Sequence, residues 1–118
     1  VDEIETTSAK IPGPDNSNIL SQRFLVKAGE KVKVQAVAAS NGKDPGKGRL
    51  QINWIDQQGR FISASISIFN STVEPNKYSK VFVVPLSAVE GVVYVSPHDK
   101  GSVLKFKSME ALRASKDD

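Results

Sequence analysis

Apolar and polar residues alternate with a period of two along most of this chain. Residues 31–40 (KVKVQAVAAS) place Val32, Val34, Ala36 and Ala38 on one face and charged or polar residues on the other. A period of two is typical of a half-buried β-strand. Similar runs lie between Gly, Pro and Asn residues at positions 19–26, 50–56, 60–69, 78–84, 91–96 and 102–108. The pattern predicts an all-β sandwich of seven antiparallel strands, or eight if an edge strand precedes the Pro12/Pro14 pair.

The clearest local signal is a β-hairpin over residues 50–69 (LQINWIDQQGRFISASISIF), whose turn ends at Gly59. In its first strand, Leu50, Ile52 and Trp54 alternate with Gln51 and Asn53. In its second strand, four apolar residues (Ile62, Ala64, Ile66 and Ile68) alternate with three serines (Ser63, Ser65 and Ser67). Because one face of such a strand packs on the core, we expect both apolar sets to face inward. The polar sets would then share the outer face.

The expected polar face is the candidate ligand surface. Amide and hydroxyl groups on a rigid sheet can pair with hydroxyl-rich ligands, and aromatic side chains can stack on them. The candidate ligand-binding residues are Gln51, Asn53, Phe61, Ser63, Ser65, Ser67 and Tyr78. The alternatives are a solvated face without a ligand and a Tyr78 that closes the edge of the sandwich. Trp54 lies on the apolar face, so we interpret it as a core residue and not as a stacking platform.

Composition narrows the function further. The chain has 118 residues, 39% of them hydrophobic and 25% charged, which fits one folded domain. Its net charge is +3, and its basic residues are scattered without interleaved aromatics, which argues against nucleic acid. No apolar run approaches the roughly 20 residues that cross a bilayer.

Few groups are available for catalysis. The chain has no cysteine and one histidine, His98, which lies in a turn between Pro97 and Gly101. Thiol chemistry and any mechanism that needs two imidazoles are therefore excluded. No nucleophile, metal site or carboxylate pair can be assembled from the sequence, and we expect no enzymatic activity.

The domain organisation expected from the sequence has three parts. Residues 1–18 form an extended or partly disordered lead-in, residues 19–109 form the sandwich, and residues 110–118 form a frayed tail or a linker, with a short helical turn from Met109 as the alternative. The chain starts at Val1 without an initiator Met or a leader. We therefore expect a domain of a larger exported or cell-surface protein, in an extracellular, periplasmic or surface location.

Four segments, in this order, carry a resemblance to a known family. They are residues 24–34 (FLVKAGEKVKV), 54–60 (WIDQQGR), 82–88 (FVVPLSA) and 103–106 (VLKF). Their order resembles that of the CenC-like carbohydrate-binding modules, which have the galactose-binding-like fold. The resemblance spans roughly residues 19–109 and implies a single jelly-roll β-sandwich.

The resemblance also implies a function. Modules of this type are non-catalytic accessory domains that bind polysaccharide, so the expected partners are glycans and other domains of the parent protein. The family commonly has acidic residues after its last Phe, where they help to bind a structural calcium ion. Lys107 and Ser108 follow Phe106 here, so we expect no cofactor. The alternative is a structural or protein-interaction sandwich that binds no sugar.

Overall fold

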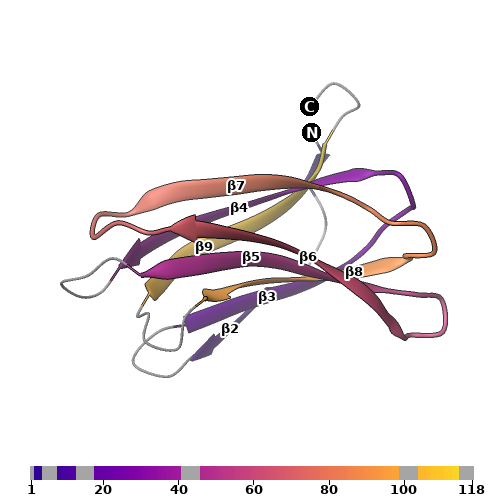
Figure 1. The fold of residues 1–118 in the computed structure, drawn as a ribbon, viewed down its shortest axis with the longest axis horizontal. Helices are drawn as coiled ribbons and strands as arrows, with labels where there is room; N and C mark the ends of the chain where they lie inside the picture. The colour runs from indigo at the N-terminus through magenta and orange to yellow at the C-terminus, as the bar shows by residue number, and fades with distance from the viewer. Residues whose placement is uncertain (1, 4–7, 13–17, 41–45, 99–103, 115–118) are drawn as a thin grey trace.

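The computed structural model describes residues 2–3, 8–12, 18–40, 46–98 and 104–114, and these form two antiparallel β-sheets packed face to face (Figure 1). The strands are β1 (Asp2–Glu3), β2 (Ser8–Pro12), β3 (Asn18–Leu25), β4 (Lys31–Ser40), β5 (Lys47–Ile55), β6 (Phe61–Asn70), β7 (Asn76–Val83), β8 (Glu90–Pro97) and β9 (Leu104–Ala114). One sheet has the order β1-β9-β4-β7 and the other β2-β3-β8-β5-β6. The predicted all-β jelly-roll sandwich is confirmed. The described residues form no helix that could cross a membrane.

Both ends of the described chain take part in the sheets. β2 pairs with β3, which confirms the edge strand expected before the proline pair. β9 continues to Ala114 and pairs with β4 as far as Lys31. The alternative of a helical turn from Met109 is therefore wrong up to Ala114. The helix-forming residues of this segment (MEALRA) become strand because pairing with β4 outweighs their local preference.

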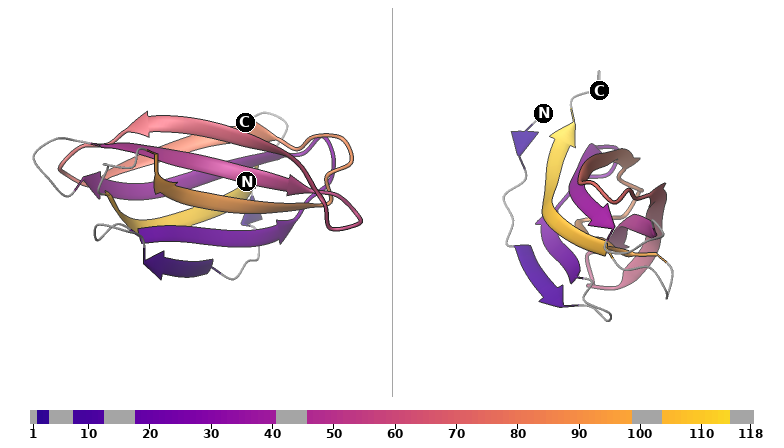
Figure 2. Two further views of the ribbon diagram at one scale, coloured as in Figure 1. Left: turned by 60° about the horizontal axis from the view of Figure 1, so that its bottom comes forward. Right: turned by 90° about the vertical axis from the view of Figure 1, so that its left-hand side faces the viewer.

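The core lies between the two sheets, whose layered arrangement is visible from the end of the molecule in Figure 2. β4 and β5 contribute regular sets of inward residues, because every second side chain of each strand is buried. Trp54 is fully buried beside Leu50 and Ile52, which confirms its predicted place in the core. Such burial contributes roughly 25 cal/mol for each Å² of apolar surface removed from water.

A bulge in the hairpin decides which face of β6 points inward. The turn forms as predicted: Gly59 has a φ of 82°, and the backbone N–H of Asp56 donates to the carbonyl of Arg60 at 2.9 Å. The pairing begins with Ile55 opposite Phe61 but continues with Trp54 opposite Ser63. One extra residue in β6 therefore moves every later side chain of the strand to the opposite face.

Aromatic rings close the inner space along β6 and β7. The Phe69 ring stacks on Tyr78, with centroids 4.0 Å apart, and meets Phe106 edge to face at 6.5 Å. Gly48, directly opposite Phe69 on β5, leaves room for this ring. A Cβ atom at position 48 would lie 2.1 Å from Phe69 Cζ, so a larger residue there displaces the ring. The position of the Phe69 ring on the inner face thus depends on Gly48 of the neighbouring strand.

Candidate functional site

The structure separates the residues of the expected polar face. Residues directly opposite each other in an antiparallel pair share a face, and Ser65 lies opposite the buried Ile52. Trp54 Nε1 donates a hydrogen bond to Ser65 Oγ at 2.9 Å, which fixes this serine on the inner side. Gln51 lies opposite Ile66, which is 50% exposed. The prediction that the serines join Gln51 and Asn53 on one face is therefore wrong, because of the bulge.

The outer face of β5 carries a polar stripe made of Arg49, Gln51 and Asn53. All three side chains are half-buried and alternate with the core residues of the strand. At about 3.4 Å per residue, the stripe extends about 14 Å along the sheet. It runs along the middle of the outer surface, because β5 is flanked by β8 on one side and β6 on the other.

The neighbouring strands give this stripe two different borders. On β8, Tyr94 lies opposite Gln51 and is half-buried. On β6, Ile66 lies opposite the same glutamine and Ile68 lies opposite Arg49. The central row of this surface therefore consists of Tyr94, Gln51 and Ile66, and it spans about 10 Å across three strands. A ligand on this face would meet an aromatic ring, an amide and an aliphatic side chain together.

Hydrogen bonds link the stripe from end to end. Arg49 Nη1 donates to Gln51 Oε1 at 3.1 Å, and Gln51 Nε2 donates to Asn53 Oδ1 at 2.7 Å. Arg49 Nη2 also donates to the carbonyl of His98 at 3.4 Å. This relay orients the amides before any ligand arrives, and the Asn53 Nδ2 group at its end still has two N–H donors. Preoriented donors on a rigid sheet bind without a large ordering cost.

The remaining predicted residues lie elsewhere. Phe61 lies opposite Ile55 at the start of β6 and is 60% exposed. Tyr78 lies opposite Ala36 on the inner face of β7, where it stacks on Phe69 and packs against the core. Its hydroxyl is buried with no hydrogen-bond partner among the described residues. Tyr78 therefore closes the edge of the sandwich, the alternative considered for it from the sequence.

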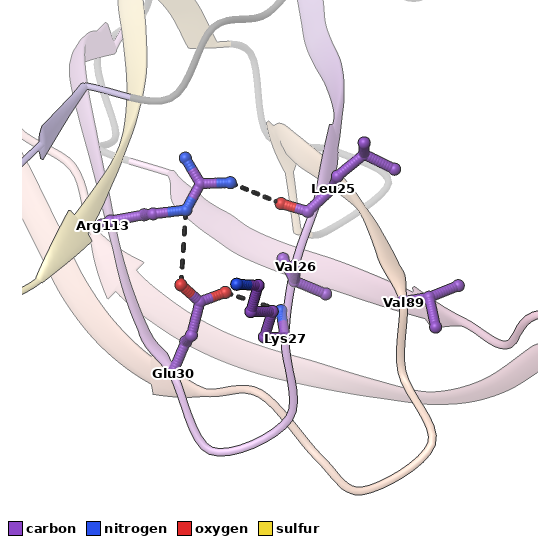
Figure 3. A pocket seen from close by; sticks show the side chains of 6 residues that line it. All are labelled: Leu25, Val26, Lys27, Glu30, Val89 and Arg113. Atoms are coloured by element: carbon purple, nitrogen blue, oxygen red, sulfur yellow. Dashed lines mark hydrogen bonds and ion pairs between the residues drawn. The ribbon is translucent and has the colours of Figure 1, made fainter.

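A separate cavity of about 530 Å³ lies at one end of the sandwich, between the end of β3 and β9 (Figure 3). Arg113 reaches across it, donating to the carbonyl of Leu25 at 2.8 Å and pairing with Glu30 at 3.4 Å. Glu30 also accepts the backbone N–H of Lys27 at 2.6 Å. The Arg113 and Glu30 side chains are thus already engaged with each other, whereas Leu25, Lys27 and Val89 are exposed. The stripe on β5 is the better candidate for polar recognition.

No cluster of three or more metal-binding side chains occurs within the described ranges. Lys105 and Lys107 flank Phe106 on β9, and both point away from the core with exposed side chains. Cations at these positions fit poorly with a calcium site, which needs several oxygen ligands.

Comparison with known proteins identifies the architecture. No family model and no curated protein sequence matches the chain. Among solved structures, it is similar to the xylan-binding CBM22-1 domain of Xyn10C from Paenibacillus barcinonensis, with a TM-score of 0.62 and 10% identity over 98% of this chain and 99% of that one. The fold is that of carbohydrate-binding modules.

Two further similar structures belong to longer chains. The CBM22-1–GH10 portion of endo-1,4-β-D-xylanase 10B from Clostridium thermocellum, solved with xylohexaose, gives a TM-score of 0.64 and 12% identity over 94% of this chain and 25% of that one. The enzymatically active domain of tailspike protein 4 from bacteriophage CBA120 gives 0.56 and 16% over 97% and 18%. This chain thus spans a quarter or less of either solved chain. At such identities the comparison establishes the fold alone.

Sequence reasoning missed Arg49, Tyr94, Ile66 and Ile68 as parts of the outer surface. The alternation within β5 already placed Arg49 in phase with Gln51 and Asn53, and that signal could have extended the stripe. Tyr94 joins it only through the pairing of β5 with β8, strands about 40 residues apart in the chain. The local pattern holds no information on that register.

Proposed function

We propose that this chain is a non-catalytic carbohydrate-binding module that binds polysaccharide on the outer face of its five-stranded sheet. In this proposal it is an accessory domain of a larger exported or cell-surface protein. The observation that carries the proposal is the preoriented relay Arg49–Gln51–Asn53 beside Tyr94, on a fold shared with carbohydrate-binding modules. The lining of the cavity near Arg113 contains no amide side chain comparable to those of this relay.

The chemistry of the stripe suits a sugar chain. Amide and guanidinium groups pair with the hydroxyl groups of sugars, while the Tyr94 ring and the Ile66 side chain can cover their apolar C–H surfaces. A binding track about 14 Å long spans more than one sugar unit, which favours a polysaccharide over a monosaccharide. The proposal retains Gln51 and Asn53 as ligand-binding residues and adds Arg49 and Tyr94.

The other candidate residues take different roles in this proposal. Ser65 supports the sheet from inside by accepting the indole N–H of Trp54, and Tyr78 closes the edge. Ser63 and Ser67 share the inner face with Ser65, and Phe61 lies beyond the stripe near the turn. These residues would affect binding only through the position of the strand.

Titration of the labelled chain with soluble xylans, galactans and glucans, followed by amide NMR shifts, tests this proposal. We expect shifts that cluster at Gln51, Asn53 and Tyr94. Asn53→Ala should weaken binding about tenfold, because the end of the donor relay is lost, with almost no change in stability. The matched control is Ser63→Ala, a polar truncation on the opposite face of the same hairpin, which should bind like the parent chain.

Two outcomes would contradict the proposal. Shifts confined to Ser63, Ser67 and Tyr78 would place the ligand on the inner edge between β6 and β7. Silence across a broad polysaccharide panel would leave a sandwich that has the fold of these modules without their binding activity.

A further inference from the structure

β6 forms one margin of the five-stranded sheet and pairs, within the described residues, only with β5. Its ten residues, FISASISIFN, include no charged residue and no proline. Ile66 and Ile68 are each 50% exposed on its outer side. A long, uncharged edge strand rich in β-branched residues readily pairs with another strand.

The other three sheet margins differ from β6 in this respect. β1 has two residues, β2 (SAKIP) contains a lysine and a proline, and β7 carries Lys77 and Lys80. Short length, lysine and proline are the features that discourage pairing between sheet edges. Only the β6 margin lacks all of them among the described strands.

One hydrogen bond shows which residues of β6 point their backbone N–H and C=O groups toward β5 and which point them away. The N–H of Ser71 donates to the carbonyl of Gly46 at 2.9 Å, one step beyond the pair Lys47–Asn70 in the same register. In an antiparallel pair, hydrogen-bonded and non-hydrogen-bonded positions alternate. The serines of β6 therefore direct their backbone groups toward β5. Ala64, Ile66, Ile68 and Asn70 direct theirs away from it, to the open side.

We infer that β6 pairs with β6 of a second copy of this chain, antiparallel, on a two-fold axis at Ile66. Ile66 is the outward-directed residue nearest the middle of β6, so this register places Ile66 opposite its own copy and pairs Ala64 with Ile68 in both directions. Residues paired in this way share a face, so the exposed isoleucines cover one another. An uncharged strand lets two chains of net charge +3 meet without like charges at the contact.

The pairing would join two five-stranded sheets into one of ten strands. A two-fold contact between identical edges uses both edges and stops at a dimer. It also places both Arg49–Asn53 stripes on the same side of the joined sheet. Two sites on one rigid surface would hold a long polysaccharide by two attachments, although the inference on pairing does not rest on the proposed function.

Sedimentation equilibrium of the chain over a dilution series, without any sugar, tests the inference. We expect a reversible monomer–dimer equilibrium. Ile66→Lys places two like charges at the two-fold axis and should raise the dissociation constant by at least about tenfold. The matched control is Val83→Lys, which adds the same charge at an exposed apolar position of the other long edge strand, β7. It should dimerise like the parent chain.

A second variant tests whether the backbone carries the contact. Ile66→Pro removes an N–H that points away from β5, so the internal ladder is retained and the chain should fold as a monomer. If Ile66→Pro folds and still dimerises, the inference is wrong. A parent chain that stays monomeric at its highest soluble concentration also overturns the inference. This holds even if β6 of that monomer pairs with an extended peptide of another protein.

Amide hydrogen exchange locates the contact even if the proline variant does not fold. The amides of Ala64, Ile66 and Ile68 should become protected as the concentration rises, whereas those of Ser65 and Ser67 should be protected at every concentration. A dimer in which the amides of Ile66 and Ile68 still exchange rapidly would use a different surface, and would overturn the assignment to β6.

Discussion

The two strands of the β5–β6 hairpin have the same type of sequence pattern and opposite outcomes. In β5 the apolar set, including Trp54, faces the core and the polar set faces out. In β6 the polar set faces in and Ile66 and Ile68 face out. β5 is paired on both sides and its inner face is filled, whereas β6 is an edge whose register is shifted by one bulge. Alternation therefore reveals that a strand has two faces, and the pairing decides which one is buried.

The largest expected difference between the two strands is in the cost of removing an apolar side chain. Trp54→Ala should lower the free energy of unfolding by about 3–5 kcal/mol, because it leaves a cavity in a closed part of the core. Ile66→Ala should lower it by less than about 1 kcal/mol, because that side chain is half exposed. Urea denaturation at low protein concentration measures both. Similar large losses for the two variants would mean that Ile66 is buried and that β6 has the face first expected.

The next effect concerns the pair of Gly48 on β5 and Phe69 on β6. Gly48→Ala should destabilise the chain by about 1–3 kcal/mol, since the new Cβ overlaps the Phe69 ring and pushes it off Tyr78. Phe69→Leu in the same chain removes the overlap, so the double variant should lose less than the sum of the two single variants. Urea unfolding of the four chains gives this comparison, and strict additivity would show that the ring does not lie on Gly48.

A smaller effect distinguishes two serines of the same strand. Ser65→Ala removes the acceptor of the Trp54 indole N–H and should cost about 1 kcal/mol, since an unpaired donor is left beside the core. The side chain of Ser63 makes no hydrogen bond to other described residues, so Ser63→Ala is the matched control and should change stability by less than about 0.5 kcal/mol. Indole fluorescence during unfolding reports on both. Equal effects would contradict the inward placement of Ser65.

These contrasts show which features of the fold could be predicted from the sequence. The regular patterns of β4 and β5 predicted their core residues, and Asp56 to Gly59 predicted the turn, because each signal is local. The face of β6 was not predictable from its alternation, because one extra residue at the start of the strand reverses every later position. The outer surface formed by Gln51 and Tyr94 depends on the register of two strands distant in sequence, which no local pattern contains.

The strand at residues 109–114 was missed for a related reason. Residues 109–114 (MEALRA) have a local preference for helix, and they pair with the first six residues of β4, 31–36. In both places a long-range pairing overrode the local signal. The candidate site was therefore half predictable: its amides on β5 were identified, and its borders on β6 and β8 were not.

The smallest expected effect lies in the turn that joins the two strands. The backbone N–H of Arg60, which the Asp56 carboxylate accepts at 2.8 Å, is the largest cause that holds the pKa of Asp56 below its ordinary value of 3.8. Desolvation opposes this shift, whereas the N–H of Gln58 and the Arg60 guanidinium add to it. A lowered pKa in the folded chain means that the carboxylate stabilises the fold above pH 3.8 and loses this contribution as the pH falls through the folded value.

Asp56→Asn keeps the turn acceptor and removes the charge, so it should be slightly less stable than the parent chain at neutral pH. The difference between the two should shrink as the pH falls below 3.8 and the parent carboxylate becomes protonated as well. Urea midpoints across this range measure the difference. Glu74→Gln, which removes an exposed carboxylate that makes no side-chain hydrogen bond or ion pair with the described residues, is the control and should follow the parent chain at each pH. A constant gap between Asp56→Asn and the parent chain would show that the turn depends on the shape of the side chain and not on its charge.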